Sequence, residues 1–531
     1  MPHLAPNPVN ESDPEAALPQ KKSGLRLQAK RHLLMIAVVG ILLLVIQTLG
    51  SAWTAEFDGF PDESAQFVSG QLLRQFVITM HVHDPMGWAG QYYLHYPKVG
   101  IGHWPPAYHV MEALWSIVFG PSRIAAMLLQ WFLAAVGLVA FVNLARRRLS
   151  WIITCGIVLL TVATPVFQTG LEQTMAEPAC FLCGVAFLYA MVAFLEHPRQ
   201  LYLLLTLLSI GVAVLTKGTG ALLAMVPVMA WIVSGKRFPL PSKKVLAVLA
   251  IAAVICAVSY ASAGNIMDWG GMRFAAPWPI WCLGALAGWG FVALAIVGVR
   301  REPLPLVAAC MCVSAVVFSF FVRAMSEPRH WIIILPAIML LAGEAVASRP
   351  RWAAPVLAAA LFLFPWYFYR QQPAGYRELF RQLPLPARIL ISANSANGEG
   401  GAVAEVVILD RKPLQSFVAR ASKVFASSGW NGENYQLLVN TVAEIDRRLD
   451  ELAIDEVILD TPDASVPVHL VATKQAMEGN PDWRLCAQAG RLKAYCRVAK
   501  PRFPRVPLDL VVAGHRLTEQ IDAESAPASG R

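Results

Sequence analysis

The chain has 531 residues, of which 56% are hydrophobic and 15% are charged, and its mean hydropathy is +0.50. This apolar content excludes an ordinary soluble protein and predicts a polytopic α-helical membrane protein. The net charge of +9 does not indicate a nucleic-acid partner, because Lys and Arg stand mainly in short runs between apolar segments. Such runs are typical of residues that set membrane topology.

Residues 1–31 predict a disordered, basic cytoplasmic tail. The first 20 residues are rich in Pro, Asn, Glu and Ala, and Lys and Arg residues follow them. The apolar run at 32–53 is too long for the core of a signal peptide and lacks a convincing small-residue cleavage site, so we expect it to remain as an anchor. It opens a transmembrane domain that we expect to cover 32–369.

The first connection, 54–121, is long, only partly polar and expected on the outer side of the membrane. Four carboxylates stand at its start: Glu56, Asp58, Asp62 and Glu63. They belong either to a solvated loop or to a catalytic base that faces a lipid-borne substrate. Residues 64–80 and 107–119 have the apolar spacing of helices in the membrane interface. The Pro and Gly residues of 85–106 predict an irregular loop between them, so the connection is either a roof over a site or a packing device.

A membrane span needs ~20 apolar residues. By this criterion we expect about eleven spans, at 33–53, 122–145, 150–166, 178–195, 200–216, 219–235, 245–263, 278–298, 303–322, 331–348 and 352–369. Basic residues stand on alternate connections: 146–148, 199, 236–244, 300–301 and 349–351. All of them lie on the side of the N-terminus, as the positive-inside rule requires, and the C-terminal part then lies outside the cytoplasm.

The segment 201–233 contains either one helix or two spans. One helix would be ~50 Å long, which exceeds the thickness of the bilayer. The glycines after Lys217 permit a break, and a single span would move the basic residues of 236–244 and 300–301 to the outside. Two spans are therefore preferred.

Residues 370–531 have the pattern of a small soluble α/β domain. The expected strands are 388–392, 415–418 and 455–459, the expected helices end at 409 and cover 437–452, and a hairpin is expected at 483–498. The glycine cluster 398–401 follows the first strand, and it is either a phosphate-binding turn or a plain loop, the second being the commoner case. Cys486 and Cys496 flank the turn of the hairpin and are candidates for a disulfide in an oxidising compartment.

The outer carboxylates suit general-base activation of an acceptor hydroxyl or amine, because burial and neighbouring charges tune the pKa of a carboxyl group. Cationic groups would hold a phosphate leaving group, and the same side of the membrane offers Lys98, Lys217 and Arg329. None of these spacings is diagnostic by itself.

Five short motifs occur in a family-specific order: Asp62-Glu63-Ser-Ala-Gln-Phe67, Pro105-Pro106-Ala-Tyr108, Glu177-Pro178, Leu215-Thr-Lys-Gly218 and Arg329-His-Trp-Ile-Ile-Ile-Leu-Pro336. By these motifs the chain resembles the polyprenyl-phosphate-dependent membrane glycosyltransferases of the C-type fold (GT-C). The similar branch includes protein mannosyltransferases and the aminoarabinose transferases of lipid A, which are glycosyltransferase families 39 and 83. The resemblance covers roughly residues 30–350.

The resemblance implies transfer of a sugar from a polyprenyl-phosphate donor to a lipid, glycan or protein acceptor at the outer face of the cytoplasmic (inner) membrane, with inversion. It implies that Asp62 acts as the base, with Glu63 as a neighbouring catalytic candidate. The second acidic position corresponds to Glu177, or alternatively to Glu172. Lys217 and Arg329 correspond to groups that hold the carrier phosphate, although Lys217 could instead snorkel from a helix end.

The chain also departs from the family. Many members have Lys directly before the Pro-Pro pair, whereas here His103 and Trp104 precede it and Lys98 lies seven residues before Pro105. The role of Lys98 in phosphate binding is therefore open. No cofactor is implied with certainty, but a divalent metal is possible on three histidines with Asp84 nearby. These histidines are His81, His83 and His103.

Two other classes of function compete with the transferase. A transporter or flippase for a lipid-linked sugar would also place charges at the membrane edge, and it should show paired broken helices in corresponding halves. The sequence has one break, at Lys217, and no internal repeat. A non-catalytic assembly protein would tolerate replacement of Asp62 and Glu177.

Overall fold

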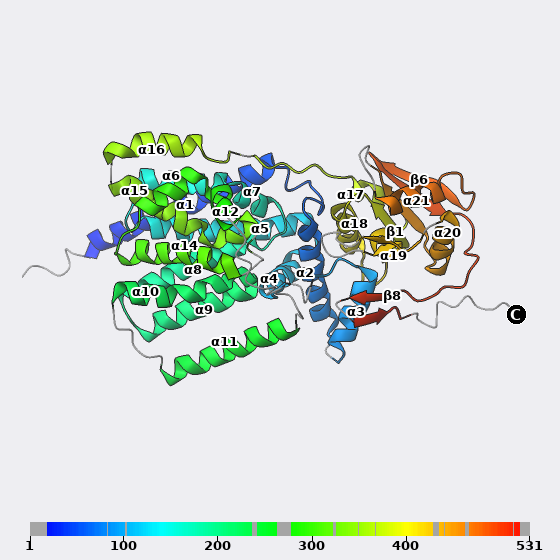
Figure 1. Ribbon diagram of the computed structural model, residues 1–531, viewed down its shortest axis with the longest axis horizontal. Helices are drawn as coiled ribbons and strands as arrows, with labels where there is room; N and C mark the ends of the chain where they lie inside the picture. Colours follow the sequence, from blue (N-terminus) through cyan, green and yellow to red (C-terminus); the bar gives the residue numbers. More distant parts are fainter. Residues whose placement is uncertain are drawn as a thin grey trace, which may run out of the picture.

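The computed structural model describes residues 18–81, 83–100, 104–235, 242–262, 278–321, 325, 327–348, 350–366, 368–427, 435–439, 441–461, 467–512 and 515–520. Figure 1 shows a helical bundle at one end of the molecule and a smaller domain with a sheet at the other. The helices of the first connection lie between these two parts.

Each segment predicted as a span contains a helix or a broken helix. The bounds are α1 (Leu18–Leu49), α5 (Arg123–Ala145), α6 (Trp151–Ala163) with α7 (Pro165–Glu172), α8 (Glu177–Glu196), α9 (Gln200–Thr216), η2 (Gly218–Met225) with α10 (Val226–Ser234), α11 (Lys243–Ser262), α12 (Trp278–Ala287) with α13 (Trp289–Val297), α14 (Pro303–Phe321), η4 (Pro328–Ile334) with α15 (Leu335–Ser348), and α16 (Pro350–Phe362). Among the described residues, four helical segments are long and apolar enough to cross a membrane: α5, α8, α14 and η4–α15. The bent pair α6–α7, which turns by 64°, is a fifth candidate. The chain is an integral membrane protein, and the count of eleven spans stays a prediction.

The predicted break after α9 is confirmed. Lys217 has extended backbone angles, φ −155° and ψ 136°, and η2 begins at the next residue. A Cβ at Gly220 would overlap the backbone of Ala213, so the absence of a side chain lets η2 fold directly onto the end of α9.

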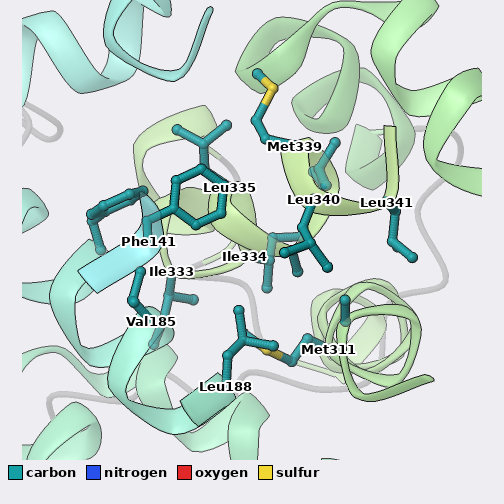
Figure 2. Packing of buried hydrophobic residues seen from close by; sticks show 14 of the residues in the cluster. Phe141, Val185, Leu188, Met311, Ile333, Ile334, Leu335, Met339, Leu340 and Leu341 are labelled. Carbon is teal, nitrogen blue, oxygen red and sulfur yellow. The ribbon is translucent and has the colours of Figure 1, made fainter. Parts of the chain in front are cut away.

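The core of the bundle joins the elements that carry the site. Figure 2 shows Phe141 of α5, Leu188 of α8 and Met311 of α14 packed around the η4–α15 segment. A Cβ at Gly184 of α8 would overlap the carbonyl oxygen of Ile333 in η4. The glycine therefore permits the backbones of α8 and η4 to touch, and their relative position is set by close packing.

The connections predicted to be cytoplasmic meet at one end of the bundle. Arg148 after α5 donates to Glu344 of α15 at 2.5 Å and lies 4.0 Å from Glu302 before α14. Arg147 lies 3.7 Å from Glu196 at the end of α8. These contacts bring three separate connections together, as the alternation of basic loops predicts.

The first connection forms three helices: α2 (Pro61–Thr79), α3 (Pro85–His95) and α4 (Ala107–Phe119). The predicted helices near 64–80 and at 107–119 are confirmed, but the prediction of an irregular loop throughout 85–106 is wrong. Pro85 stands at the start of α3, where its missing N–H is not needed, and Asp84 accepts a hydrogen bond from the Gly87 N–H at 2.9 Å.

The C-terminal domain has a five-stranded sheet with strand order β2-β1-β5-β7-β6. β1 (Arg388–Ala393) pairs in parallel with β2 (Phe417–Arg420) and β5 (Glu456–Asp460), and the antiparallel hairpin β6 (Trp483–Ala489) and β7 (Leu492–Arg497) completes it. The remaining elements are α17 (Tyr376–Phe380), α18 (Ala396–Leu409), α19 (Ala421–Val424), β3 (Ala426–Ser427), β4 (Gln436–Leu437), α20 (Val442–Glu451), α21 (Val468–Met477), β8 (Asp509–Val512) and β9 (His515–Thr518). The α/β pattern and the Cys486–Cys496 disulfide of the hairpin are both confirmed.

The glycine cluster 398–401 is neither a phosphate-binding turn nor a plain loop. These residues form the first turns of α18, whose N-cap Ser395 accepts a hydrogen bond from the Gly398 N–H at 3.3 Å. All four residues are buried, and α18 packs against α2. Both loop interpretations were wrong because the glycines serve close packing between the domains.

Candidate functional site

The four carboxylates at the start of the first connection point to four different places. Glu56 accepts hydrogen bonds from the backbone N–H groups of Gly375, Tyr376 and Arg377 at 2.9, 3.1 and 2.7 Å. It thereby caps the first turn of α17 and joins the first connection to the C-terminal domain.

Asp58 lies against α18, where a Cβ at Gly401 would come within 2.9 Å of the Asp58 Cβ. Burial, followed by the charges of Glu56 and Glu63, raises the pKa of Asp58 to about 7. This carboxyl group is thus held partly protonated near neutral pH, away from the cationic residues of the predicted site.

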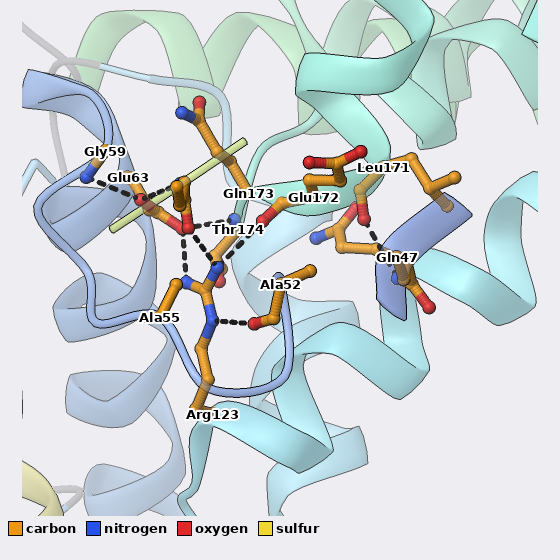
Figure 3. Close-up of polar contacts among 12 residues, drawn as sticks. Gln47, Ala52, Ala55, Gly59, Glu63, Arg123, Leu171, Glu172, Gln173 and Thr174 are labelled. Carbon is orange, nitrogen blue, oxygen red and sulfur yellow. Dashed lines mark hydrogen bonds and ion pairs between the residues drawn. The ribbon is translucent and has the colours of Figure 1, made fainter. Parts of the chain in front are cut away.

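Glu63 is buried in a network around Arg123 (Figure 3). One of its oxygens pairs with the Arg123 guanidinium and accepts from the Thr174 N–H at 3.1 Å, and the other accepts from the Gly59 N–H at 3.1 Å. Arg123 also donates to the carbonyls of Ala52 and Glu172. Both carboxylate oxygens of Glu63 therefore have hydrogen-bond donors, and Glu63 lines neither of the two cavities described below. The geometry favours a structural role for Glu63 over a catalytic one.

Asp62 lies in the first turn of α2 and contacts Arg329 of η4, with 2.8 Å between Oδ2 and Nη2. The guanidinium of Arg329 also donates to Glu327 at 2.5 Å and lies 4.3 Å from the centroid of the Phe60 ring. These contacts hold Arg329 between two carboxylates and an aromatic face. The structure therefore unites two predicted site residues that are far apart in the chain.

Glu177 and Lys217 form a second pair, with 2.7 Å between Oε1 and Nζ. Glu177 begins α8, and Lys217 stands at the break between α9 and η2. The ammonium group of Lys217 points to Glu177, which disfavours the interpretation that Lys217 snorkels from the helix end towards the membrane surface. The charge of Arg329 also acts on Glu177, so the two pairs form one electrostatic cluster.

A cavity of about 210 Å³ lies beside these pairs. Glu177, Glu327 and Arg329 supply its charged wall, and residues of α7 and the following turn supply much of the rest. Glu172 does not line it; its carboxylate packs against Gly50, the residue after α1, and its oxygens accept no hydrogen bond from the described residues. Of the two alternatives for the second acidic position, the geometry favours Glu177.

A larger cavity of about 630 Å³ runs along α8 and α9, with walls also from α4 and α5. Its lining extends along α9 from Thr216, next to Lys217, to Tyr202, and along α8 from Ala179 to Ala193. Each of these stretches covers fifteen residues, and their fourteen helical steps correspond to ~21 Å. We call this cavity the α8–α9 groove. Most of its lining is apolar, and its end at Thr216 lies one residue from Lys217.

Lys98 lies at the seam between the first connection and α18, and it lines neither cavity. The side chain is buried, and Nζ donates to the carbonyl of Ala396 at 3.4 Å. Burial, followed by the nearby charge of Arg420, lowers the pKa of Lys98 to about 7, while the charge of Asp62 opposes this shift. Arg420 and Glu399, which touch this seam, were not identified from the sequence because no motif marks them.

The proposed metal ligands are dispersed where the structure describes them. His81 stacks on Trp88 at 4.3 Å and hydrogen bonds Thr79 through Nδ1 at 2.6 Å, while Asp84 caps α3. His83 is exposed, and His103 lies outside the described residues. Within the described ranges, no group of three His, Cys, Asp or Glu side chains is arranged to hold a metal ion.

Comparisons with known proteins support the resemblance. Residues 103–260 match the family model described as dolichyl-phosphate-mannose-protein mannosyltransferase, and this range contains the Pro105, Glu177 and Lys217 motifs. The chain is similar to the apo structure of ArnT from Cupriavidus metallidurans, with 13% identity, a TM-score of 0.56 and coverage of 90% of this chain and 100% of ArnT. The structure of ArnT bound to undecaprenyl phosphate matches with 13% identity, a TM-score of 0.55 and coverage of 88% and 99%. No curated protein matches the chain.

Proposed function

We propose that this protein, which has the C-type fold seen in ArnT, transfers a sugar from a polyprenyl-phosphate donor to an acceptor. The transfer takes place at the outer face of the cytoplasmic membrane. One observation carries the proposal. The Glu177–Lys217 ion pair lies at the end of the α8–α9 groove, next to its lining residues Ala179 and Thr216, and Arg329, which pairs with Asp62, acts on Glu177 through its charge. The groove would take the apolar polyprenyl chain, and the two cations would take the phosphate.

The phosphate would compete with the carboxylates for the cations. When Arg329 turns from Asp62 to the phosphate, Asp62 becomes free to accept a proton from the acceptor hydroxyl or amine. The acceptor atom then bonds to the anomeric carbon as the carbon–oxygen bond to phosphate breaks. The polyprenyl phosphate leaves with both bonding electrons, and this single displacement inverts the anomeric centre.

The other charged residues have supporting roles. Glu177 would orient Lys217, and Glu63 would hold the loop before α2 through Arg123. Lys98 would add positive charge beside Asp62. The proposal covers transfer to a lipid, a glycan or a protein acceptor.

We also propose that the protein resides in the inner membrane with its N-terminus in the cytoplasm and its C-terminal domain outside. The disulfide supports an oxidising compartment for that domain. The gathering of Arg147 and Arg148 with other connections at the opposite end of the bundle supports a cytoplasmic location for that end.

The direct test is sugar transfer by the purified protein in lipid nanodiscs, with radiolabelled polyprenyl-phosphate sugars and membrane extract as a source of acceptors. We expect Asp62→Asn to lower transfer by about 10²–10⁴-fold, as is usual for loss of a general base, while donor binding is retained. Asp84→Asn, which alters a helix cap far from the pairs, serves as the control. Undiminished transfer by Asp62→Asn would remove Asp62 from the mechanism.

The broken helices keep a lipid-sugar flippase as a second candidate. The bend of 64° between α6 and α7 and the break at Lys217 are the kind of discontinuity found in transporters. Vesicles that contain the protein and a labelled donor distinguish the two functions. Movement of the donor between leaflets without sugar transfer would favour the flippase.

A further inference from the structure

The seam between α18 and the first connection is unusually close. A Cβ at Gly400 would overlap Ser64 Oγ and lie 2.7 Å from Lys98 Cε. Figure 1 shows α18 beside α2, the helix that carries both Asp62 and Ser64. Only glycine allows α18 to approach these two segments of the membrane domain so closely.

A buried ion pair of the C-terminal domain holds the same segment from a second direction. Arg420, at the end of β2, donates to Glu399 of α18 at 2.9 Å, and it also donates to the carbonyl of Pro97 at 3.2 Å. The carboxylate of Glu399 also accepts hydrogen bonds from the Ser422 hydroxyl and from the Ser422 N–H, the latter at 3.0 Å. The carbonyl of Pro97, the residue before Lys98, is therefore hydrogen-bonded to the Arg420 side chain. That side chain is fixed by its place at the end of β2 and by its pair with Glu399 of α18.

We propose that the C-terminal domain forms part of the donor site: Gly400 of α18 and the Arg420–Glu399 pair clamp Lys98 beside the first turn of α2. Arg420 and Glu399 are positioning residues, because they act through Lys98 and the backbone of Pro97. We call this arrangement the seam clamp. The inference rests on the proposed function, in which Asp62 activates the acceptor and the nearby cations hold the donor phosphate.

The charges around Lys98 explain why its position matters. Arg420 and Lys423 face it from the C-terminal domain, Asp62 faces it from α2, and Glu399 faces it from α18. Two like charges and two opposite charges act on the ammonium, so a movement of Lys98 relative to them changes how strongly it attracts a phosphate. If the clamp opens, water reaches Lys98, and its depressed pKa rises towards the ordinary value for lysine.

The test uses the full-length protein in nanodiscs and four clamp variants: Gly400→Ala, Arg420→Gln, the conservative Arg420→Lys and the milder Ser422→Ala. Arg388→Gln is the matched control, because Arg388 also pairs with a buried glutamate of the same domain, Glu519, at 2.8 Å, but does not contact Pro97 or Lys98. For every variant we would measure undecaprenyl phosphate binding, the melting temperature and the modification of Lys98 by an amine-reactive reagent, quantified by mass spectrometry.

We expect Gly400→Ala and Arg420→Gln to weaken binding about tenfold and to expose Lys98 to the reagent. Ser422→Ala should show the same changes to a smaller extent, and Arg420→Lys should restore part of the binding. Arg388→Gln should lower the melting temperature while Lys98 stays protected and binding is unchanged. Should a stronger variant fail to fold, Ser422→Ala still provides the comparison.

Two results would overturn the seam clamp. One is wild-type binding together with full protection of Lys98 in all clamp variants, and the other is that the clamp variants resemble Arg388→Gln in every measurement. Failure of the proposed function appears differently. The wild-type protein would then not bind the lipid phosphate, while the Lys98 modification would still report whether the clamp exists.

Discussion

Replacement of Arg123 by Met tests the assignment of Glu63 as a structural residue. Arg123 pairs with Glu63 and donates to the carbonyls of Ala52 and Glu172 at 2.8 and 2.7 Å and to Gln371 Oε1 at 2.8 Å. The side chains of Arg123 and Glu63 are 2% and 0% exposed, so Met would leave a carboxylate buried without its counter-ion.

Breaking a buried ion pair by removing one partner costs about 3–5 kcal/mol, and we expect Arg123→Met to lower the free energy of unfolding by that amount. The hydrogen bonds are not added to this figure, because groups within one network are not additive. Glu63→Gln keeps the shape of the side chain and should cost less. The double variant should be less destabilised than the sum of the two single variants, because neither partner is then left as an isolated charge.

The assay is equilibrium unfolding in detergent, followed by tryptophan fluorescence, with sugar transfer measured at a temperature where all variants are folded. We expect folded Glu63→Gln to transfer sugar within about threefold of wild type, which corresponds to less than about 1 kcal/mol in the barrier. A cost below about 1 kcal/mol for Arg123→Met would refute the structural argument, because it would place the pair in the range of exposed salt bridges. A loss of transfer by folded Glu63→Gln comparable to that of Asp62→Asn would return Glu63 to the chemistry.

Three further predictions concern the donor site and the topology. Because burial lowers the pKa of Lys98 to about 7, its ammonium form is present below that pH and lost above it. Donor binding should therefore weaken as the pH rises from 6 to 9. The variant Lys98→Arg stays protonated over this range and should remove the pH dependence. A pH dependence unchanged in Lys98→Arg would exclude Lys98 as its source. Ala186→Trp should fill the α8–α9 groove and weaken binding of a long-chain polyprenyl phosphate at least tenfold, but leave binding of a short-chain analogue unaffected. Equal effects on both lipids would contradict the assignment of the groove to the polyprenyl chain. Loss of the Cys486–Cys496 disulfide, which closes a short loop, should destabilise the domain by about 2–3 kcal/mol in thermal unfolding. In intact cells, these thiols should react with a membrane-impermeant maleimide only after reduction, and free thiols shielded from the reagent until lysis would place the domain in the cytoplasm.

The elements that could be predicted are those set by local pattern. A long apolar segment in a membrane must satisfy its own backbone hydrogen bonds, so each predicted span contains helix whatever its neighbours are. The strand Arg388–Ala393 and the hairpin with its disulfide follow from short-range alternation and from cysteines close in sequence. The helix α3 was missed because its Pro and Gly residues resemble a loop, although Pro85 is well suited to the first turn.

The sequence by itself determined the class of the protein, the order of the family motifs and the residue types available for the chemistry. Only the tertiary structure decided which of these residues meet. Asp62 and Glu63 are adjacent in the chain, yet neighbours on a helix point about 100° apart, so Asp62 reaches Arg329 of η4 while Glu63 reaches Arg123 of α5. The glycines of α18 likewise acquire their role from α2 and Lys98, which belong to another domain. Partners so distant in sequence are chosen by the packing of whole helices and domains, and no local spacing encodes that choice.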